Sequence, residues 1–334
     1  MTRLSALLVA TSIAVVPVSA IAGSAVDSFN TPGNILITDQ FNNRVIEVGQ
    51  HHHQIVWQFG SGDPNDCLPG ASSVIAPNDA ERLAGGLTLI AGTGTGACPD
   101  NRVLIVDQAG NIVFQYGQAG VAGFGPNQLN TPVFAIQEPS GNLLITDQGN
   151  NRLIRVDSNK NILWTYGPTS GPGALNAPNS GELLHNGHIL IADENNNRVL
   201  EIGPLGRVYR MFGQGLMTVA FASRLGFDHT LIADSGNNRV LEIDGAGNTV
   251  FQHVTNTDPN SNPNPNPTGA VRLRNGNTLI ADQFNNRVIE VTPAGNMVFQ
   301  YGKTNVVGNG PNELNAPYSA VEIGQYIGVT KPAP

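Results

Sequence analysis

An aspartate and an arginine recur together along the chain, always five positions apart. A ring of such carboxylates could bind metal ions or a cationic substrate, because their oxygens are hard, negatively charged ligands. The alternative is local: an aspartate at a strand end accepts N–H groups of the next turn, and the planar guanidinium pairs with a carboxylate. Equal repetition favours this structural role, because a catalytic site needs one asymmetric group of residues. The pairs are Asp39 with Arg44, Asp147 with Arg152, Asp193 with Arg198, Asp234 with Arg239 and Asp282 with Arg287, and Arg102 takes the same place in a disturbed copy.

The histidines and cysteines give little sign of a metal centre. His51–His53 could coordinate a transition metal, but neighbouring residues on a strand edge point to opposite sides, so a solvated turn is the alternative. The sequence lacks a Cys/His cluster with the spacing of a structural zinc site. We therefore predict no metal and no cofactor, while calcium or zinc in a central channel stays open.

The first 22 residues have the features of an export signal. Arg3 gives a short positive region, the apolar run 4–16 is too short to span a bilayer, and small residues lead to cleavage after Ala20 or Ala22. We predict a protein secreted to the periplasm or beyond, without a membrane span once residues 1–22 are removed. Seventeen basic against 25 acidic residues, with a net charge of −8, disfavour a nucleic-acid partner.

Two cysteines, Cys67 and Cys98, lie in irregular segments that contain glycine and proline. In an exported chain this pattern favours one disulfide between them, and two free thiols are the alternative.

The aspartate–arginine pairs belong to a longer internal repeat. The six arginines follow one another at spacings of 58, 50, 46, 41 and 48 residues, which suits the blades of a β-propeller. Within each copy, short branched apolar runs alternate with turns such as Asn186-Gly187, a strong hairpin signal. The sequence therefore predicts an all-β fold, a six-bladed β-propeller of four-stranded antiparallel blades.

The two ends of the mature chain predict how the ring closes. The chain enters at 35–39 on the second strand of a unit, without a first strand. Residues 314–317 repeat the pattern that precedes first strands elsewhere, so 318–323 should complete the first blade and remove its sheet edge. We predict one propeller over residues 23–330 and a tail over 331–334.

The repeat resembles the NHL repeat. Two segments carry the resemblance: Ile-Ala/Thr-Asp-x-x-Asn-Asn-Arg-Val-Ile/Leu, clearest at 191–200, 232–241 and 280–289, and an aromatic-Gly stretch that leads to Leu-Asn-x-Pro. Together they cover nearly all of the mature chain, and they imply a six-bladed scaffold more than an activity. The chain departs from the pattern at Gly92, where aspartate is expected, and in the loop after Phe212, which lacks Leu-Asn-x-Pro. A weaker similarity connects it with arylsulfotransferase-type and quinone-cofactor propellers.

A functional site should lie where the repeat varies. The loops after the second and fourth strands share one face, which also carries both cysteine loops and the proline-rich tract 258–267. Amides, hydroxyls and one carboxylate on this face suit a protein or peptide, or an uncharged polar ligand such as a glycan, and a water-filled channel without a ligand is the alternative. The residues predicted to line the channel mouth lie just after the prolines of the repeat: Asn78, Asp79, Asn179, Ser180, Thr268, Tyr318 and Ser319.

These observations predict a secreted, monomeric, non-catalytic binding module. The alternative is a propeller enzyme, since some six-bladed propellers resemble lactonases, amidating lyases or sulfotransferases. Such an enzyme would use Asp79, Glu81 and Arg82, together with Tyr318, near one mouth of the channel.

Overall fold

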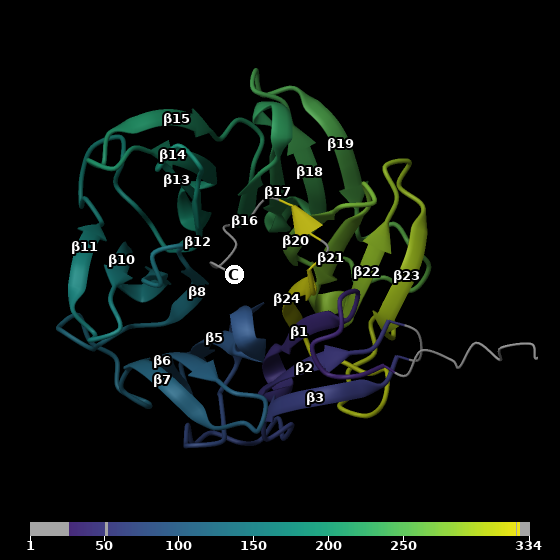
Figure 1. Cartoon of the computed structure of the whole chain (residues 1–334). Coiled ribbons are helices and arrows are strands. Elements are labelled where there is room, and N and C mark those ends of the chain that lie inside the picture. The colour runs from purple at the N-terminus through teal and green to yellow at the C-terminus, as the bar shows by residue number, and fades with distance from the viewer. Residues whose placement is uncertain (1–26, 51–52, 325, 328–334) are drawn as a thin grey trace, which may run out of the picture.

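The computed structural model describes residues 27–50, 53–324 and 326–327. These residues form six antiparallel sheets set in a ring around a central axis (Figure 1). The predicted all-β, six-bladed propeller is therefore confirmed. The predicted signal segment and the tail over 331–334 lie outside the described residues. None of the described helices is long and apolar enough to cross a membrane.

Each blade has four main strands, which lie side by side in order from the channel to the rim. Blade 1 contains β24 (Pro317–Glu322), β1 (Ile35–Asp39), β2 (Arg44–Val48) and β3 (Ile55–Gly60); blade 2 contains β4 (Pro77–Arg82), β5 (Thr88–Gly94), β6 (Pro99–Val106) and β7 (Ile112–Gly117); blade 3 contains β8 (Pro132–Gln137), β9 (Leu143–Asp147), β10 (Arg152–Val156) and β11 (Ile162–Tyr166). Blade 4 contains β12 (Pro178–Leu183), β13 (Ile189–Asp193), β14 (Arg198–Ile202) and β15 (Val208–Phe212); blade 5 contains β16 (Val219–Arg224), β17 (Thr230–Asp234), β18 (Arg239–Ile243) and β19 (Thr249–Val254); blade 6 contains β20 (Pro267–Leu273), β21 (Thr278–Asp282), β22 (Arg287–Val291) and β23 (Met297–Gly302).

Short 3-10 helices follow the second strand in five blades, and two more lie in hairpins. The first group is η1 (Gln40–Asn42), η3 (Gln148–Asn150), η4 (Glu194–Asn196), η6 (Ser235–Asn237) and η7 (Gln283–Asn285), and the hairpin pair is η2 (Ala84–Gly86) and η5 (Gly226–Asp228).

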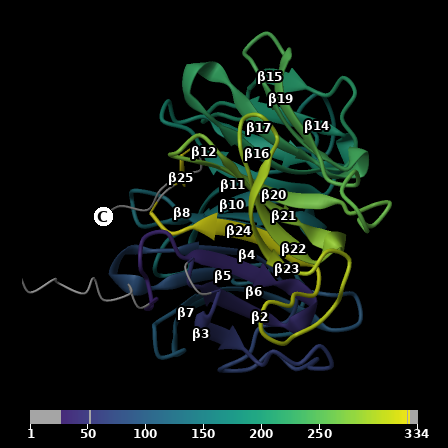
Figure 2. The ribbon, with the colours of Figure 1, turned by 90° about the vertical axis from the view of Figure 1, so that its right-hand side faces the viewer.

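The ring closes as the sequence predicts. β24, the inner strand of blade 1, pairs antiparallel with β1, and Ile35 faces Glu322 while Ile37 faces Ala320. In the side view the yellow β24 lies among the purple strands from the start of the chain (Figure 2). Closure gives β1 a partner on both sides and removes an open sheet edge. A fifth strand that the sequence did not predict, β25 (Tyr326–Ile327), pairs with β20 in blade 6.

The core lies between the blades, with one hydrophobic cluster at each of the six junctions. The second strands are buried along their whole length, while the outermost strands are partly exposed. At the closing junction, Ile37 of blade 1 and Ala320 of β24 pack against Leu279 and Val288 of blade 6. Burial of β-branched and leucine side chains is the dominant favourable contribution here.

The asparagine before the repeated arginine, which is the second residue of an Asn-Asn pair in every blade except blade 2, ties each blade to the next. This asparagine adopts the left-handed conformation, with φ of 53° at Asn197, which asparagine tolerates better than most residues. The Oδ1 atom of Asn197 then accepts the N–H of Thr218, at the entrance of the next blade, at 2.7 Å. The loop after Phe212 therefore keeps this link although it lacks Leu-Asn-x-Pro. The other five links run from Asn43 to Ala76, Asn101 to Thr131, Asn151 to Ala177, Asn238 to Asn266 and Asn286 to Ala316.

The predicted disulfide is present. Cys67 and Cys98 are bonded, with their Cα atoms 4.9 Å apart. The bond joins the loop between β3 and β4 to the loop between β5 and β6 on one face of the ring. It therefore fastens blade 1 to blade 2 on the face that carries the repeat motif.

A candidate binding channel at the ring axis

The aspartates of the repeat are held inside their own blades. Asp193 is fully buried; its Oδ2 atom accepts from Arg198 Nε at 2.7 Å and from Asn196, and its Oδ1 atom accepts the Asn176 N–H at 2.8 Å. Both oxygens therefore already have hydrogen-bond partners. We call the repeated aspartate–arginine pairs, with the asparagine turns between them, the frame. The same pair at 2.7 Å joins Asp39 with Arg44, Asp147 with Arg152, Asp234 with Arg239 and Asp282 with Arg287.

Blade 2 has Gly92 in place of the repeated aspartate, and Asp100 on β6 provides the carboxylate instead. Arg102 pairs with Asp100, whose carboxylate also accepts the Ile75 N–H at 2.7 Å. A Cβ atom placed on Gly92 would lie only 2.9 Å from the Asp100 carboxyl group. The glycine therefore makes room for a carboxylate that enters from the neighbouring strand. Sequence reasoning missed Asp100, although an aspartate two residues before the arginine of the one copy without Asp at its usual place was the available signal.

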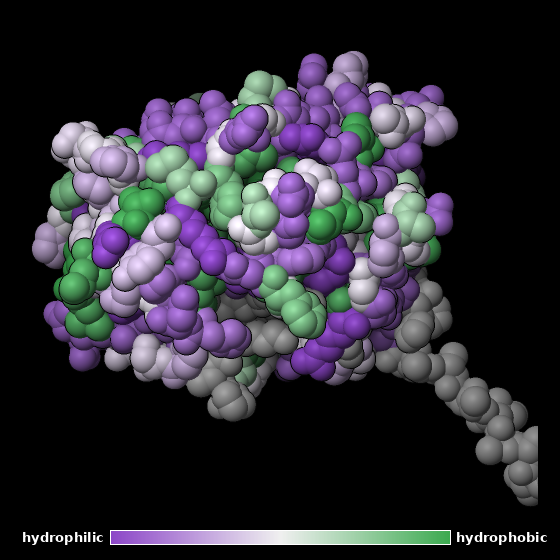
Figure 3. All heavy atoms as spheres, turned by 90° about the horizontal axis from the view of Figure 1, so that it is seen from above, coloured by the Kyte–Doolittle hydropathy of each residue, from purple (hydrophilic) through white to green (hydrophobic). Residues whose placement is uncertain are grey.

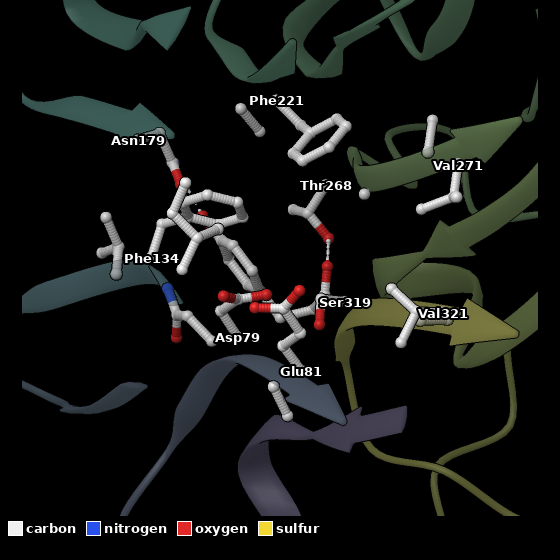
Figure 4. Close-up of a pocket in the computed structure, with 18 residues that line it drawn as sticks. Asp79, Glu81, Phe134, Asn179, Phe221, Thr268, Val271, Ser319 and Val321 are labelled. Carbon is white, nitrogen blue, oxygen red and sulfur yellow. Dashed lines mark hydrogen bonds between the residues drawn. The ribbon is translucent and has the colours of Figure 1, made fainter. Parts of the chain in front are cut away.

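The inner strands enclose a cavity at the ring axis (Figure 4). Residues from all six blades line this cavity. Its volume is about 40 Å³, which is enough for roughly three waters. Six of the seven predicted mouth residues line this cavity: Asn78, Asp79, Asn179, Thr268, Tyr318 and Ser319.

Ser180 is the predicted mouth residue that does not line the cavity. It is buried, and its hydroxyl accepts the Ala222 N–H of the next inner strand at 3.2 Å. Asp79 makes the equivalent contact, since its Oδ2 atom accepts the Ala135 N–H at 3.3 Å. The carboxylate differs from the hydroxyl in having a second oxygen that faces the cavity.

Two acids in this cavity lie against apolar walls. Asp79 and Glu81 point into the space that Phe134 and Phe221 border (Figure 4). Burial raises the pKa of Asp79 to about 7, and the backbone N–H of Ala135 and the Ser319 side chain only partly oppose this shift. A carboxylate in such surroundings is costly to ionise, so it favours a ligand or a proton that neutralises it.

Arg82 is not part of this acidic group. Its Nη2 atom lies 2.6 Å from Glu47 Oε2, and its guanidinium stacks on the rings of Phe29 and Trp57. The group that the enzyme alternative requires is therefore divided: Asp79, Glu81 and Tyr318 line the cavity, and the arginine is engaged at the junction of blades 1 and 2.

Amide side chains connect mouth residues of blades 3 and 4 with Tyr318 of blade 1, across the channel. Asn179 Nδ2 donates to Tyr318 Oη at 2.7 Å and to Glu194 Oε2 at 2.6 Å, and Gln148 donates to the same carboxylate at 2.9 Å. Burial raises the pKa of the Tyr318 phenol, and the nearby Glu194 carboxylate raises it further. The phenol therefore stays protonated and can act as a hydrogen-bond donor.

A similar chain of hydrogen bonds runs through blades 6, 1 and 2. Gln283 Nε2 donates to Gln40 Oε1 at 2.9 Å, and Gln40 Nε2 donates to Asn78 Oδ1 at 2.7 Å. The glutamines and Glu194 are the residues directly after the repeated aspartate. Sequence reasoning missed them, and the signal was their variation at a position that immediately follows a fixed one.

Neither a family model nor a curated protein sequence matches the chain. Solved structures do match it. A protein of unknown function from Bacteroides caccae has a TM-score of 0.62 and 14% identity over 87% of this chain and 98% of that one. A chain of a nidogen/laminin complex has a TM-score of 0.58 and 12% identity, over 86% of this chain and 97% of that one. Catalytically inactive virginiamycin B lyase from Staphylococcus aureus with quinupristin has a TM-score of 0.51 and 16% identity, over 74% of this chain and 73% of that one.

The likeness is one of fold. A lyase and a protein from a two-component complex both share the propeller, so the fold does not decide between catalysis and binding.

The histidine run contributes no metal site that can be described. His51 and His52 lie outside the described residues, and the ring of His53 packs edge-on against Phe299 and Tyr301, with centroids 5.0 Å and 6.0 Å away. Within residues 27–50, 53–324 and 326–327, no group of three or more His, Cys, Asp and Glu side chains is placed to hold a metal ion.

Proposed function

We propose that the protein is a secreted, non-catalytic binding module of the NHL-repeat type that recognises a protein or peptide through its loop face and channel mouth. The observation that carries this proposal is the acidic, aromatic-walled cavity at the axis, where side chains differ from blade to blade while the surrounding frame repeats. The disulfide and the sequence features of an export signal support secretion.

The cavity supports a particular chemistry for the group that enters it. A cavity of about 40 Å³ favours a slender group over a sugar ring, so we expect a glycan to bind at the mouth of the channel. Asp79 and Glu81 supply negative charge, and the faces of Phe134 and Phe221 attract a cation as well as apolar carbon. An ammonium group on a slender aliphatic stem, such as a lysine side chain, fits these requirements.

The rim supports recognition at the channel rather than along the outer strands. Figure 3 views the side of the ring that carries β15 and β19, where apolar side chains are interspersed with polar ones. A continuous apolar patch is the usual mark of a large protein interface, and this side of the rim does not present one.

The experiment compares peptide and glycan binding by immobilised protein. Wild type should retain lysine-containing peptides from a peptide library, and Asp79→Asn and Glu81→Gln should each weaken retention at least about tenfold, equivalent to about 1.4 kcal/mol. Arg210→Ala, which removes an exposed ion pair with Asp228 on the rim, is the matched control and should bind as wild type does. Retention of glycans alone, or equal binding by all variants, would contradict the proposal.

Catalysis is the second candidate function, favoured by the pKa of about 7 at Asp79. A carboxyl group that titrates near neutrality is suited to general acid–base chemistry. Turnover of a lactone, an aryl sulfate or a peptide that ends in α-hydroxyglycine by wild type, and its loss in Asp79→Asn, would support this candidate over the binding module.

A further inference from the structure

A second repeated contact joins the blades on the far side of the core from the repeat motif. A glutamate on the third strand of one blade faces a residue at the end of the next inner strand, the residue that pairs with the first residue of the second strand. We call this pair of positions the junction socket. In three sockets the inner-strand residue is an arginine, so the glutamate receives a guanidinium. The three pairs are Glu47 with Arg82 at 2.6 Å, Glu201 with Arg224 at 2.8 Å and Glu242 with Arg272 at 2.7 Å.

The socket where the ring closes has two carboxylates instead. Glu290 on β22 occupies the glutamate position, and Glu322, the last residue of β24, occupies the arginine position. Glu322 is 7% exposed, and within the described part of the chain its carboxylate has no hydrogen-bond or ion-pair partner. Burial raises the pKa of Glu322 to about 7, and the Glu290 charge adds to this shift.

The other polar groups at this socket are amides. Asn275 Nδ2 and Asn277 Nδ2 donate to Glu290 Oε1 at 3.1 Å and 2.6 Å. Arg272, on the inner strand of the same blade, is engaged with Glu242 at the preceding junction. The closing socket therefore places two carboxylates and their negative charge where three equivalent sockets hold a cation.

We propose that the closing socket binds a calcium ion, with the Glu290 and Glu322 carboxylates as charged ligands. Rotation of the Asn277 amide would add a neutral oxygen ligand, and water would complete the shell, while Asn275 Oδ1 keeps its hydrogen bond from the Asn277 N–H at 2.9 Å. Calcium suits this site because it takes six to eight oxygen ligands in flexible geometry, whereas zinc prefers nitrogen and sulfur and magnesium demands a near-ideal octahedron. The ion would bind β24 to blade 6 and so fasten the ring.

The test measures thermal unfolding of the mature chain in EDTA and in millimolar CaCl₂, at matched ionic strength and near-neutral pH. Extracellular sites with few charged ligands bind calcium with a Kd of about 10⁻⁴–10⁻³ M, so we expect a rise in Tm of about 2–4 °C. Isothermal titration should saturate near one calcium ion per chain.

Variants locate the effect. Glu322→Arg restores the residue of the other sockets, and it should raise the Tm in EDTA and abolish the response to calcium. Glu322→Gln, which keeps the side-chain shape, should also abolish the response and serves if the arginine variant folds poorly. Asp79→Asn removes a carboxylate of the channel and should respond to calcium as wild type does.

Two results would overturn the proposal. One is a calcium response that persists in both Glu322 variants, which would place the ion elsewhere. The other is a wild type that ignores calcium and loses stability as the pH rises from about 4.5 through about 7, with a loss that is smaller in Glu322→Gln. This result would mean that the two carboxylates share a proton and bind no metal.

Discussion

Asp193 and Asp79 are both buried carboxylates, but only Asp193 has an arginine beside it. In the frame, Arg198 and Asn196 occupy the Asp193 carboxylate within hydrogen-bond distance. In the channel, Asp79 has a backbone N–H at 3.3 Å and a serine nearby, and its pKa rises to about 7. A buried charge without a partner lowers stability. The frame aspartate therefore serves the fold, whereas the channel aspartate costs stability and is better explained by a ligand.

The largest test of the frame is removal of its fastener. Deleting residues 314–334 takes away β24 and exposes the edge of β1, along with the apolar contacts of Ile35 and Ile37. We expect the Tm, followed by circular dichroism, to fall by more than about 10 °C. Deleting only 328–334 leaves β24 and β25 in place and should have little effect. An unchanged Tm in the longer deletion would show that the ring does not depend on closure.

The next test compares two arginines of the frame. Arg102 is almost fully buried, and its guanidinium also donates to the Gly70 and Ser73 carbonyls at 2.9 Å, so Arg102→Ala should cost about 3–5 kcal/mol. The Arg198 side chain is 14% exposed, so Arg198→Ala should cost less, about 2–3 kcal/mol.

Urea unfolding measures both, and Arg210→Ala provides the control. Its ion pair with Asp228 lies at the surface, where such pairs are worth less than about 1 kcal/mol. Equal losses for all three arginines would remove the distinction between frame and surface. If Arg198→Ala lost peptide binding but kept its stability, the repeated arginines would serve binding and not the fold.

The fold was predictable because its determinants are local and repeated. Branched apolar strands and an Asn-Arg pair recur in each unit, and the chain enters on a second strand, β1, that required an inner partner from the other end of the chain. Short-range patterns of this kind specify strands and hairpins without knowledge of the ring.

The site was predictable only in part, because its details depend on which side chains meet across blades. Ser180 and Asp79 hold equivalent positions, yet only the longer carboxylate reaches both the neighbouring N–H and the cavity. Arg82 was placed with the channel acids, but its side chain lies on the other side of its strand, against Glu47. The pair Glu290–Glu322 is formed by residues from two blades that the chain joins only at closure, so no spacing in the sequence reveals it.

A third test concerns the disulfide on the loop face of the frame. Replacing Cys67 and Cys98 with serine releases a loop of sequence separation 31, which should cost about 3–4 kcal/mol in the chain-entropy model. The peptide binding of the double variant should survive at temperatures where it is folded, because the bond lies outside the cavity lining. If the double variant were folded but no longer bound peptide, the cysteine loops would be part of the binding site.

The smallest change in stability, and the most informative, is expected for Asp79→Asn. The folded-state pKa of Asp79 lies near 7, above the ordinary value of 3.8, so the folded protein takes up a proton between these two values. Stability from this group is therefore complete below about pH 4 and is lost as the pH rises through about 7. Asp79→Asn removes that dependence and should stabilise the protein by about 1–3 kcal/mol at about pH 8, measured by urea unfolding at several pH values. Glu322 titrates in the same range, so the control is the same substitution in the Glu322→Gln background. If Asp79→Asn destabilised the protein as much as an arginine variant does, Asp79 would belong to the frame. If Asp79→Asn instead raised stability and abolished binding, the ligand that Asp79 receives would explain why the protein keeps a buried charge there.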